Sequence, residues 1–335
     1  MLRYLLLTII ATLFIMSLAN AESGLISGIW NGIHYIDGDC WVRTEGGNLT
    51  MQPGTEVRFQ GNFEIRVHEG VTLSAMGAEQ NQVLFTADQG TTPGSWKALI
   101  AEGTSPGSTG KITLTHCEIC YGGESEAGIE DADGVVQGEI YAKIEVTYCY
   151  IHDNDGSGLS ISHEYNNLIA KDNKIVYCDI GIKMSSPLSQ ELTQVRRNFI
   201  NMCNTGMKLH MDPNFPVENN IIANSTGHGV WVQSSPGYFY NNVIDGTGGD
   251  GLYFDGEPTG DDCIRGNVFS HCGGYAIWVP ESQTQLTISH NCFYSCTALY
   301  PQGVTSNPEL RGDPKFVAGF GQLQSMVIPQ FIITL

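Results

Sequence analysis

The sequence predicts an all-β protein built as a solenoid of short parallel strands, and three observations lead to this prediction. A motif recurs at intervals of 22 to 25 residues along the chain. Within each repeat, apolar residues alternate with other residues, which is the periodicity of a strand. The composition agrees, because 40 of 335 residues are Gly and only 15% are charged. Such a composition favours many short strands and turns over long solvated helices.

The first landmark of each repeat is an Asn followed by any residue and then a large hydrophobe. These residues are Asn173, Asn198, Asn220, Asn242, Asn267 and Asn291, with Cys117 and Cys149 extending the series backwards. Stacked Asn amides at a turn can hydrogen-bond from one coil to the next and so satisfy polar groups that would otherwise be buried. We therefore expect an internal Asn ladder beside a column of stacked hydrophobes.

The second landmark follows eight or nine residues later and reads small, apolar, any residue, apolar. It occurs at 158–161, 181–184, 206–209, 229–232, 251–254 and 276–279. A single repeat cannot bury its apolar face alone, but stacked repeats can, so the same strand of successive coils should pair into long parallel sheets. At roughly 24 residues a coil, the 314 residues after position 21 (335 − 21) would form about 12–13 coils.

At these residues the chain resembles the right-handed parallel β-helix superfamily of pectin-lyase-like proteins. Residues 48–59, 67–77 and 83–86 are similar to the first coils of secreted bacterial members, and 312–317 resembles the segment after the last coil. The resemblance, with the general rule for parallel crossovers, implies a single-stranded right-handed parallel β-helix. The expected organisation is an N-terminal cap and first coils at 22–110, β-helix repeats at 111–300 and a C-terminal tail or cap at 301–335.

Residues 1–21 have the pattern of a secretory signal peptide. Arg3 supplies the positive start, an apolar run follows, and Ala19-Asn20-Ala21 supplies the small-residue cleavage pattern. The apolar run is shorter than the ~20 residues of a membrane-spanning helix, and no second run of that length follows. We therefore expect a secreted, periplasmic or cell-surface protein with no membrane span after cleavage.

Charge and cysteine content narrow the partners further. The formal net charge is −19, which disfavours nucleic acid because nucleic-acid binding needs a basic face. Cys178 and Cys203, and likewise Cys272 and Cys296, occupy equivalent places in adjacent coils. Strand spacing would bring each pair within disulfide range, although the parallel Cβ vectors slightly favour free stacked thiols. Cys117 and Cys120 should face opposite ways on one strand, so this pair is not expected to bind a metal.

One step in the series is longer than the others. It runs from Cys117 to Cys149 and takes 32 residues, so an excursion within 122–140 must leave the coil. That stretch contains Glu124, Glu126, Glu130, Asp131 and Asp133. The sequence therefore predicts an acidic loop there.

The central residues of the second landmark should point outward, because the apolar residues on either side face the core. One outward column is Ser160, Lys183, Lys208, Trp231, Tyr253 and Trp278; the next is Ser162, Ser185, His210, Gln233, Asp255 and Pro280. Aromatic rings flanked by polar groups suit the apolar faces and hydroxyl rims of sugars. We therefore expect Trp231, Tyr253 and Trp278, with His210 and Gln233, to bind a polysaccharide or another cell-envelope component.

The alternative is that these rings are ordinary strand residues covered by a loop or a partner chain. The protein would then be a noncatalytic cell-surface or adhesive structural rod, in which the rings meet another protein or a second copy of the chain.

For catalysis, the resemblance points first to polysaccharide lyases. Some β-helix lyases use Lys or Arg as the base and hold Ca²⁺ with acidic residues, which here would make Lys208 or Lys183 the base and Asp250 and Asp255 the calcium ligands. Two solvated lysines on a strand face remain the alternative.

Two fragments resemble glycoside hydrolases of the polygalacturonase type instead. They are Gly227-His228-Gly229, which makes His228 a catalytic candidate, and Gly260-Asp261-Asp262-Cys263. Their order along the chain is the reverse of the order in that family, and the other family motifs are missing. Lyase, hydrolase and noncatalytic readings therefore all stay open.

Overall fold

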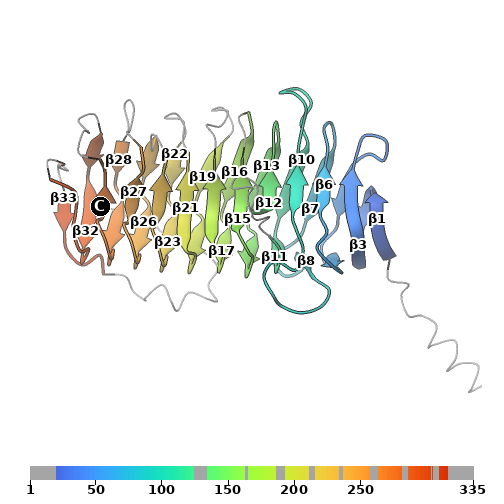
Figure 1. Cartoon of the computed structure of the whole chain (residues 1–335), viewed down its shortest axis with the longest axis horizontal. Coiled ribbons are helices and arrows are strands. Elements are labelled where there is room, and N and C mark those ends of the chain that lie inside the picture. The colour runs from blue at the N-terminus through green and yellow to red at the C-terminus, as the bar shows by residue number, and fades with distance from the viewer. Residues whose placement is uncertain are drawn as a thin grey trace, which may run out of the picture.

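The computed structural model describes residues 20–123, 134–162, 165–185, 193–210, 216–233, 237–256, 263–280, 286–302, 304 and 309–315. Within these residues the regular elements are 33 strands, with no helix. The strands lie side by side along the long axis of the molecule, from β1 at one end to β33 at the other (Figure 1). All pairings between named strands are parallel, and the predicted all-β parallel solenoid is confirmed.

A typical coil contributes three strands, each to its own row. The first row is an 11-stranded sheet, called sheet 1 here. It consists of β2 (Gly28–Trp30), β4 (Leu49–Met51), β7 (Thr72–Met76), β10 (Lys111–Thr115), β13 (Lys143–Thr147), β16 (Asn167–Lys171), β19 (Gln194–Arg196), β22 (Pro216–Glu218), β25 (Tyr238–Tyr240), β28 (Cys263–Arg265) and β31 (Thr287–Ser289).

The other two rows form one 22-stranded sheet, because β3 pairs with the first strands of both. Row 2 consists of β1 (Asn20–Leu25), β3 (Ile33–Val42), β5 (Glu56–Phe59), β8 (Val83–Ala87), β11 (Cys117–Cys120), β14 (Tyr150–His152), β17 (Lys174–Val176), β20 (Phe199–Asn201), β23 (Ile221–Ala223), β26 (Val243–Asp245), β29 (Val268–Ser270), β32 (Asn291–Tyr294) and β33 (Glu309–Arg311).

Row 3 begins where β3 bends away from row 2. It continues through β6 (Ile65–Val67), β9 (Leu99–Ala101), β12 (Gly134–Gly138), β15 (Ser157–Ile161), β18 (Ile180–Met184), β21 (Thr205–Leu209), β24 (Val230–Val232), β27 (Leu252–Phe254) and β30 (Ile277–Trp278). The expected second landmark of each repeat lies on this row.

The number of coils is lower than predicted. Sheet 1 has eleven strands, so the solenoid makes about ten turns from its first strand to its last, instead of 12–13 coils. Two turns are long, because Leu73 pairs with Ile112, 39 residues on, and Ile112 pairs with Ile144, 32 residues on. The second long turn is the predicted excursion, and its acidic residues 124–133 lie outside the described residues.

The Asn ladder is present as predicted. Asn173, Asn198, Asn220, Asn242, Asn267 and Asn291 are at most 1% exposed. Each of the first five side chains donates from Nδ2 to Oδ1 of the next, over 3.0–3.2 Å. Each Nδ2 also donates to a backbone carbonyl of sheet 1, as Asn220 does to Val195 at 3.0 Å. The ladder satisfies buried polar groups that the turns leave unpaired.

From β11 to β32, the turn that leads from sheet 1 into row 2 has one left-handed residue in each coil. Its non-glycine members have φ of 49–57°, and they are His116, Tyr148, Asp172, Arg197, Asn219, Asn241 and His290. Gly266 holds the same place in its coil. Such a φ is unfavourable for side-chain-bearing residues. The ladder that follows stabilises the turn, because the buried amides are paired only in this geometry.

The hydrophobe after each Asn lies in the core, as predicted. Ile200, Ile222 and Ile244 are fully buried, and the rings of Phe269 and Phe293 stack at 5.6 Å. The ten cysteines are all free thiols. In the two pairs left open by the sequence, Cys178 with Cys203 and Cys272 with Cys296, each thiol donates to the backbone carbonyl two residues before it.

Of the predicted signal peptide at 1–21 only residues 20–21 are described, and of the predicted tail at 301–335 only 301–302, 304 and 309–315, so those boundaries stay predictions. Among the described residues there is no helix that is long and apolar enough to span a membrane.

Candidate functional site

The predicted outward column exists in the predicted register. Lys208 pairs with Trp231 across β21 and β24, Trp231 pairs with Tyr253 on β27, and Tyr253 pairs with Trp278 on β30. We call Trp231, Tyr253 and Trp278 the aromatic strip. Upstream, Ser160 pairs with Lys183, and Lys183 pairs with Lys208. Side chains about two dozen positions apart in the sequence are therefore neighbours on row 3.

Local sequence explains why these side chains point outward. The neighbours of Trp231, Val230 and Val232, are fully buried, as are Leu252 and Phe254 beside Tyr253. Because alternate residues of a strand face opposite sides, the middle residue of each triplet must face away from the core. The aromatic strip is thus a direct consequence of the apolar alternation.

The column is less exposed than expected. Lys183 is 4% exposed and Ser160 is fully buried, although both face outward. From Lys208 onward the side chains are half-buried, and Asp255 of the second column is exposed. The accessible part of the column therefore begins at Lys208.

The rings of the strip make close contacts with one another. Tyr253 and Trp278 stack with centroids 4.9 Å apart and an interplanar angle of 21°. The imidazole of His228 stacks on Tyr253 at 4.5 Å and 22°. His228 lies in the coil before that of Tyr253, and Trp278 lies in the coil after it. The Tyr253 ring is therefore held between one ring from each neighbouring coil. Its two ring faces are accordingly turned along the solenoid axis.

Trp231 is oriented differently. Its ring is at 87° to that of Tyr253, with centroids 5.8 Å apart. The ammonium of Lys208 lies 4.7 Å from its centroid, which is a cation–π contact. Its indole Nε1 is buried and has no hydrogen-bond partner in the described structure.

His228 joins the strip through the turn that precedes β24. Its Nδ1 accepts a hydrogen bond from the backbone N–H of Asp250 at 3.1 Å, and a carboxylate oxygen of Asp250 lies 3.5 Å away. The neutral ring therefore carries its proton on Nε2. The sequence offered His228 only through a motif resemblance. A signal in the sequence could have placed His228 beside the strip: it lies 22 residues, or one coil, before Asp250, so the two residues should be neighbours on adjacent coils.

Asp250 is committed to a structural contact. Its Oδ1 accepts the backbone N–H of Tyr275 at 2.6 Å, so it holds the next coil in place. Among the described residues, neither Asp250 nor Asp255 belongs to a group of three or more His, Cys, Asp or Glu side chains whose ligand atoms converge. The calcium site at Asp250 and Asp255 therefore stays a prediction.

The second outward column also keeps its register. The backbone N–H groups of His210, Gln233 and Asp255 donate to the carbonyls of Met184, Leu209 and Val232 in the preceding coils, at 2.6–2.9 Å. The pKa of Tyr253 is raised by burial and by the nearby carboxylates of Asp255 and Asp250. Tyr253 is consequently a neutral hydrogen-bond donor beside polar side chains.

The described geometry leaves the catalytic candidates untested. Lys183 and Lys208 are neighbours on row 3, but one is buried and the other lies over Trp231. Of the hydrolase-like fragment, Gly260 to Asp262 lie outside the described residues. The roles of Lys183, Lys208 and His228 in catalysis remain predictions.

Fold and site together define a parallel β-helix with an aromatic strip on one face. Residues 141–293 match the family model described as a right handed beta helix region. The chain therefore has the right-handed parallel β-helix fold, and the resemblance inferred from its repeats is confirmed.

Several solved structures are similar to the chain at low identity. One is a double mutant of the periplasmic alginate epimerase AlgG, with 12% identity, covering 84% of this chain and 77% of that chain, and a TM-score of 0.43. Another is the A-module of the Azotobacter vinelandii mannuronan C-5 epimerase AlgE6, with 12% identity, 89% and 92% coverage, and a TM-score of 0.37.

A third is a mannuronic acid specific polysaccharide family 6 lyase from human gut microbiota, with 12% identity, 88% and 87% coverage, and a TM-score of 0.37. No curated protein matches the chain. Similarity of this degree carries no argument about what the chain binds.

Proposed function

We propose that the protein binds an extended polysaccharide through the aromatic strip and the polar groups beside it. The observation that supports this proposal is the in-register column of Lys208, Trp231, Tyr253 and Trp278 on consecutive coils. Consecutive strands lie about 4.8 Å apart, so the column offers repeated contacts along the solenoid axis. A polymer with repeated sugar units can use such contacts together, whereas a single small molecule could not.

The strip supplies two kinds of contact. Trp231, set across the other rings, can offer a ring face to the C–H groups of a sugar. The edges of Tyr253 and Trp278 and the Tyr253 hydroxyl can serve the hydroxyl rim. His210 and Gln233 lie one column further along the same row and extend the polar part of the surface.

Charge makes a further distinction within the polysaccharides. The chain carries a net charge of −19, which repels a polyanion at long range. Lys208 is the accessible cation of the strip and would meet a carboxylate at short range. Salt screens the long-range repulsion more than the short Lys208 contact, so binding of a uronate-containing glycan should strengthen as salt rises, whereas binding of a neutral glycan should not change.

The test is a binding assay over a panel of neutral and uronate-containing glycans, by isothermal titration calorimetry. The double variant Trp231→Ala with Trp278→Ala should lose at least tenfold in affinity, or about 1.4 kcal/mol. Trp41→Ala is the matched control, because Trp41 is also half-buried and lies on the same column, in β3, where it pairs with Leu25 on one side and Arg66 on the other. Equal affinities of the double variant and the control for every glycan would exclude the strip as the binding site.

A lyase activity would add a β-elimination, for which Lys208 would first have to lose its proton. The neutral amine would take the proton on the carbon beside a uronate carboxylate, the released electron pair would form a C=C bond, and the glycosidic oxygen would leave and take a proton from water. Incubation with uronate glycans, with and without Ca²⁺, would reveal this reaction through the absorbance of unsaturated products. Loss of product with Lys208→Ala would establish the base. Binding without product would identify a noncatalytic glycan-binding protein, and neither binding nor product would favour the structural rod.

A further inference from the structure

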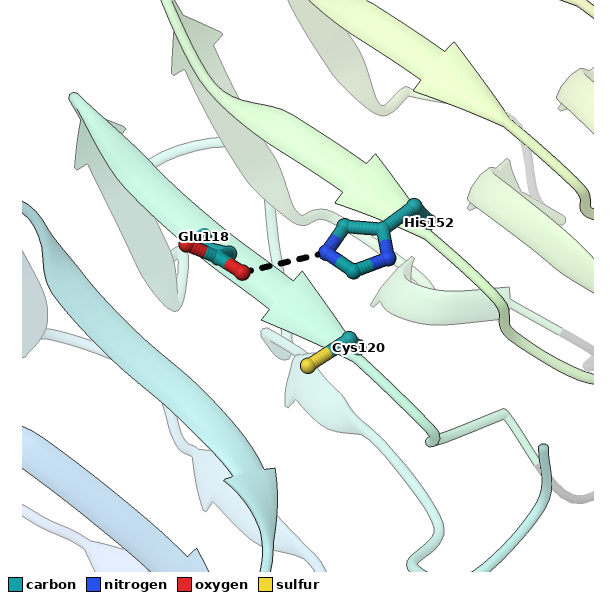
Figure 2. Close-up of side chains that lie close together, drawn as sticks. All are labelled: Glu118, Cys120 and His152. Carbon is teal, nitrogen blue, oxygen red and sulfur yellow. Dashed lines mark hydrogen bonds and ion pairs between the residues drawn. The ribbon is translucent and has the colours of Figure 1, made fainter. Parts of the chain in front are cut away.

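A second group of side chains with metal-ligand chemistry lies far from the aromatic strip, on the outward face of row 2. β11 carries Glu118 and Cys120, and β14 carries His152 (Figure 2). Cys120 and His152 are paired across the two strands. Cys117 and Ile119 are buried in the core, so Glu118 and Cys120 share the opposite, outward side. Cys117 and Cys120 therefore face opposite sides of the strand, as expected, and Cys120 lies beside Glu118 and His152 instead.

The three ligand atoms converge. Nε2 of His152 lies 3.2 Å from a carboxylate oxygen of Glu118, and all three ligand atoms are within 4.8 Å of one another. Tetrahedral Zn²⁺ has bonds of about 2.0–2.3 Å, which place its ligand atoms roughly 3.3–3.8 Å apart. The present separations therefore differ from those of a loaded site by about 1 Å or less, which side-chain rotation can supply.

The partners of the ligands suit a metal site as well. Nδ1 of His152 lies 2.7 Å from Oδ2 of Asp153, the carboxylate contact that fixes a metal-binding imidazole. The ring is also held by stacking on Tyr150 at 4.1 Å. The thiol of Cys120 donates to the Thr86 hydroxyl at 3.3 Å, and the same hydroxyl can donate back to a thiolate. Both ligands are thus oriented by neighbours on rigid strands.

A carboxylate faces each ring nitrogen of His152, Asp153 at Nδ1 and Glu118 at Nε2. A neutral imidazole donates one hydrogen, and donation to Asp153 leaves Nε2 facing the Glu118 carboxylate as a second acceptor. A cation between Nε2 and Glu118, either a proton or a metal ion, removes this repulsion. The sulfur of Cys120 at the third corner, 3% exposed, gives a metal ion an additional ligand that a proton cannot use.

We propose that Glu118, Cys120 and His152 form a binding site for a divalent transition metal ion, with Zn²⁺ the best match. Mixed sulfur, nitrogen and oxygen ligands select borderline metals such as Zn²⁺ over Ca²⁺ or Mg²⁺, which prefer oxygen. One carboxylate and one thiolate neutralise the ion. Three protein ligands leave the fourth tetrahedral position to water, so this is an open site that ties two coils together.

The test uses the full chain, without an affinity tag, reduced and freed of metal by dialysis. Zn²⁺ content by mass spectrometry should return to one ion per chain after reloading. Co²⁺, as a spectroscopic probe, should give a thiolate charge-transfer absorption that Zn²⁺ abolishes by competition. An absence of both signals in the wild-type chain would overturn the proposal.

Variants assign the ligands. Cys120→Ser should lose the charge-transfer absorption, and His152→Gln and Glu118→Gln should each weaken Zn²⁺ binding at least tenfold. The controls are Cys292→Ser, an outward cysteine on the same row, and His271→Gln, a histidine that also contacts a carboxylate, that of Asp245. Absorption that persists in Cys120→Ser, or equal losses in the controls, would refute the assignment.

A second measurement covers the case in which a variant does not fold. In the wild-type chain, Zn²⁺ should slow alkylation of Cys120 and leave alkylation of Cys292 unchanged, as read by peptide mass spectrometry. Equal alkylation of Cys120 with and without Zn²⁺ would contradict the site without any substitution.

Discussion

Removing one amide from the Asn ladder should cost the solenoid a large part of its stability. Asn220 lies in the middle of the ladder and is fully buried. Its Oδ1 accepts from the backbone N–H and the Nδ2 of Asn198, both at 3.0 Å. Its Nδ2 donates to the carbonyl of Val195 and to Oδ1 of Asn242, also at 3.0 Å. Asn220→Ala deletes all four hydrogen bonds.

The loss in the free energy of unfolding depends on which hydrogen bonds the former partners of Asn220 still make after the substitution. Asn198 Nδ2 still donates to Ala170, and Asn242 Oδ1 still accepts the backbone N–H of residue 220. The backbone N–H of Asn198 loses the acceptor that Asn220 supplied, and an orphaned buried N–H costs about 1–3 kcal/mol. With the other lost hydrogen bonds, Asn220→Ala should lower the free energy of unfolding by about 4 kcal/mol.

The assay is urea unfolding followed by far-UV circular dichroism. Asn204→Ala is the matched control, because Asn204 is exposed and makes two exposed side-chain hydrogen bonds: its Nδ2 donates to Asp179 at 3.1 Å, and its Oδ1 accepts from the Thr226 hydroxyl at 3.0 Å. The control should lose less than about 1 kcal/mol. Should Asn220→Ala lose no more than Asn204→Ala, the ladder would not be the stabilising element described above.

A charge variant sharpens the test. Asn220→Asp places a carboxylate opposite two acceptors, the Val195 carbonyl and Oδ1 of Asn242. Burial and these acceptors should raise the pKa of the new carboxyl above its unfolded value. The variant should therefore be less stable than Asn220→Ala at neutral pH and regain stability as the pH falls through that raised pKa. A stability difference independent of pH would contradict the ladder geometry.

Three further predictions concern other parts of the solenoid. Gly266→Ala should lower the free energy of unfolding by about 2 kcal/mol, because Gly266 has φ of 71° and an added Cβ would lie 2.3 Å from Oδ1 of Asn241. In the same urea assay Gly312→Ala should be neutral, because an added Cβ there would meet nothing within 4 Å. The hydrogen bond from the Tyr300 hydroxyl lowers the pKa of Glu309 in the folded protein. The ionised Glu309 therefore stabilises the fold at any pH above the pKa of this carboxyl in the unfolded chain, and this stabilisation is lost as the pH falls through the folded pKa. Tyr300→Phe should therefore shift acid unfolding to higher pH, and an unchanged transition would refute this link. Thiol titration after denaturation without reductant should count ten free thiols, since all ten cysteines are unbonded, and a count lower by an even number would show disulfides.

The sequence alone was sufficient to predict the fold, because a solenoid converts linear spacing into spatial neighbourhood. Asn residues 22 to 25 positions apart had to stack once the apolar positions between them were buried, and the ladder has the predicted hydrogen bonds. The same reasoning placed Lys208, Trp231, Tyr253 and Trp278 on consecutive strands in register. Periodicity failed only for the coil count, where two long turns interrupt it.

Features that depend on side-chain orientation and depth were settled only by the tertiary structure. The burial of Lys183 and the stacking of His228 on Tyr253 depend on how neighbouring coils fill space, which no repeat encodes. The pairing of Cys120 with His152 occurs across the 32-residue turn, where the regular period is broken. A repeat fixes which backbones are adjacent, but the packing of the folded chain determines which side chains meet and how deeply they lie.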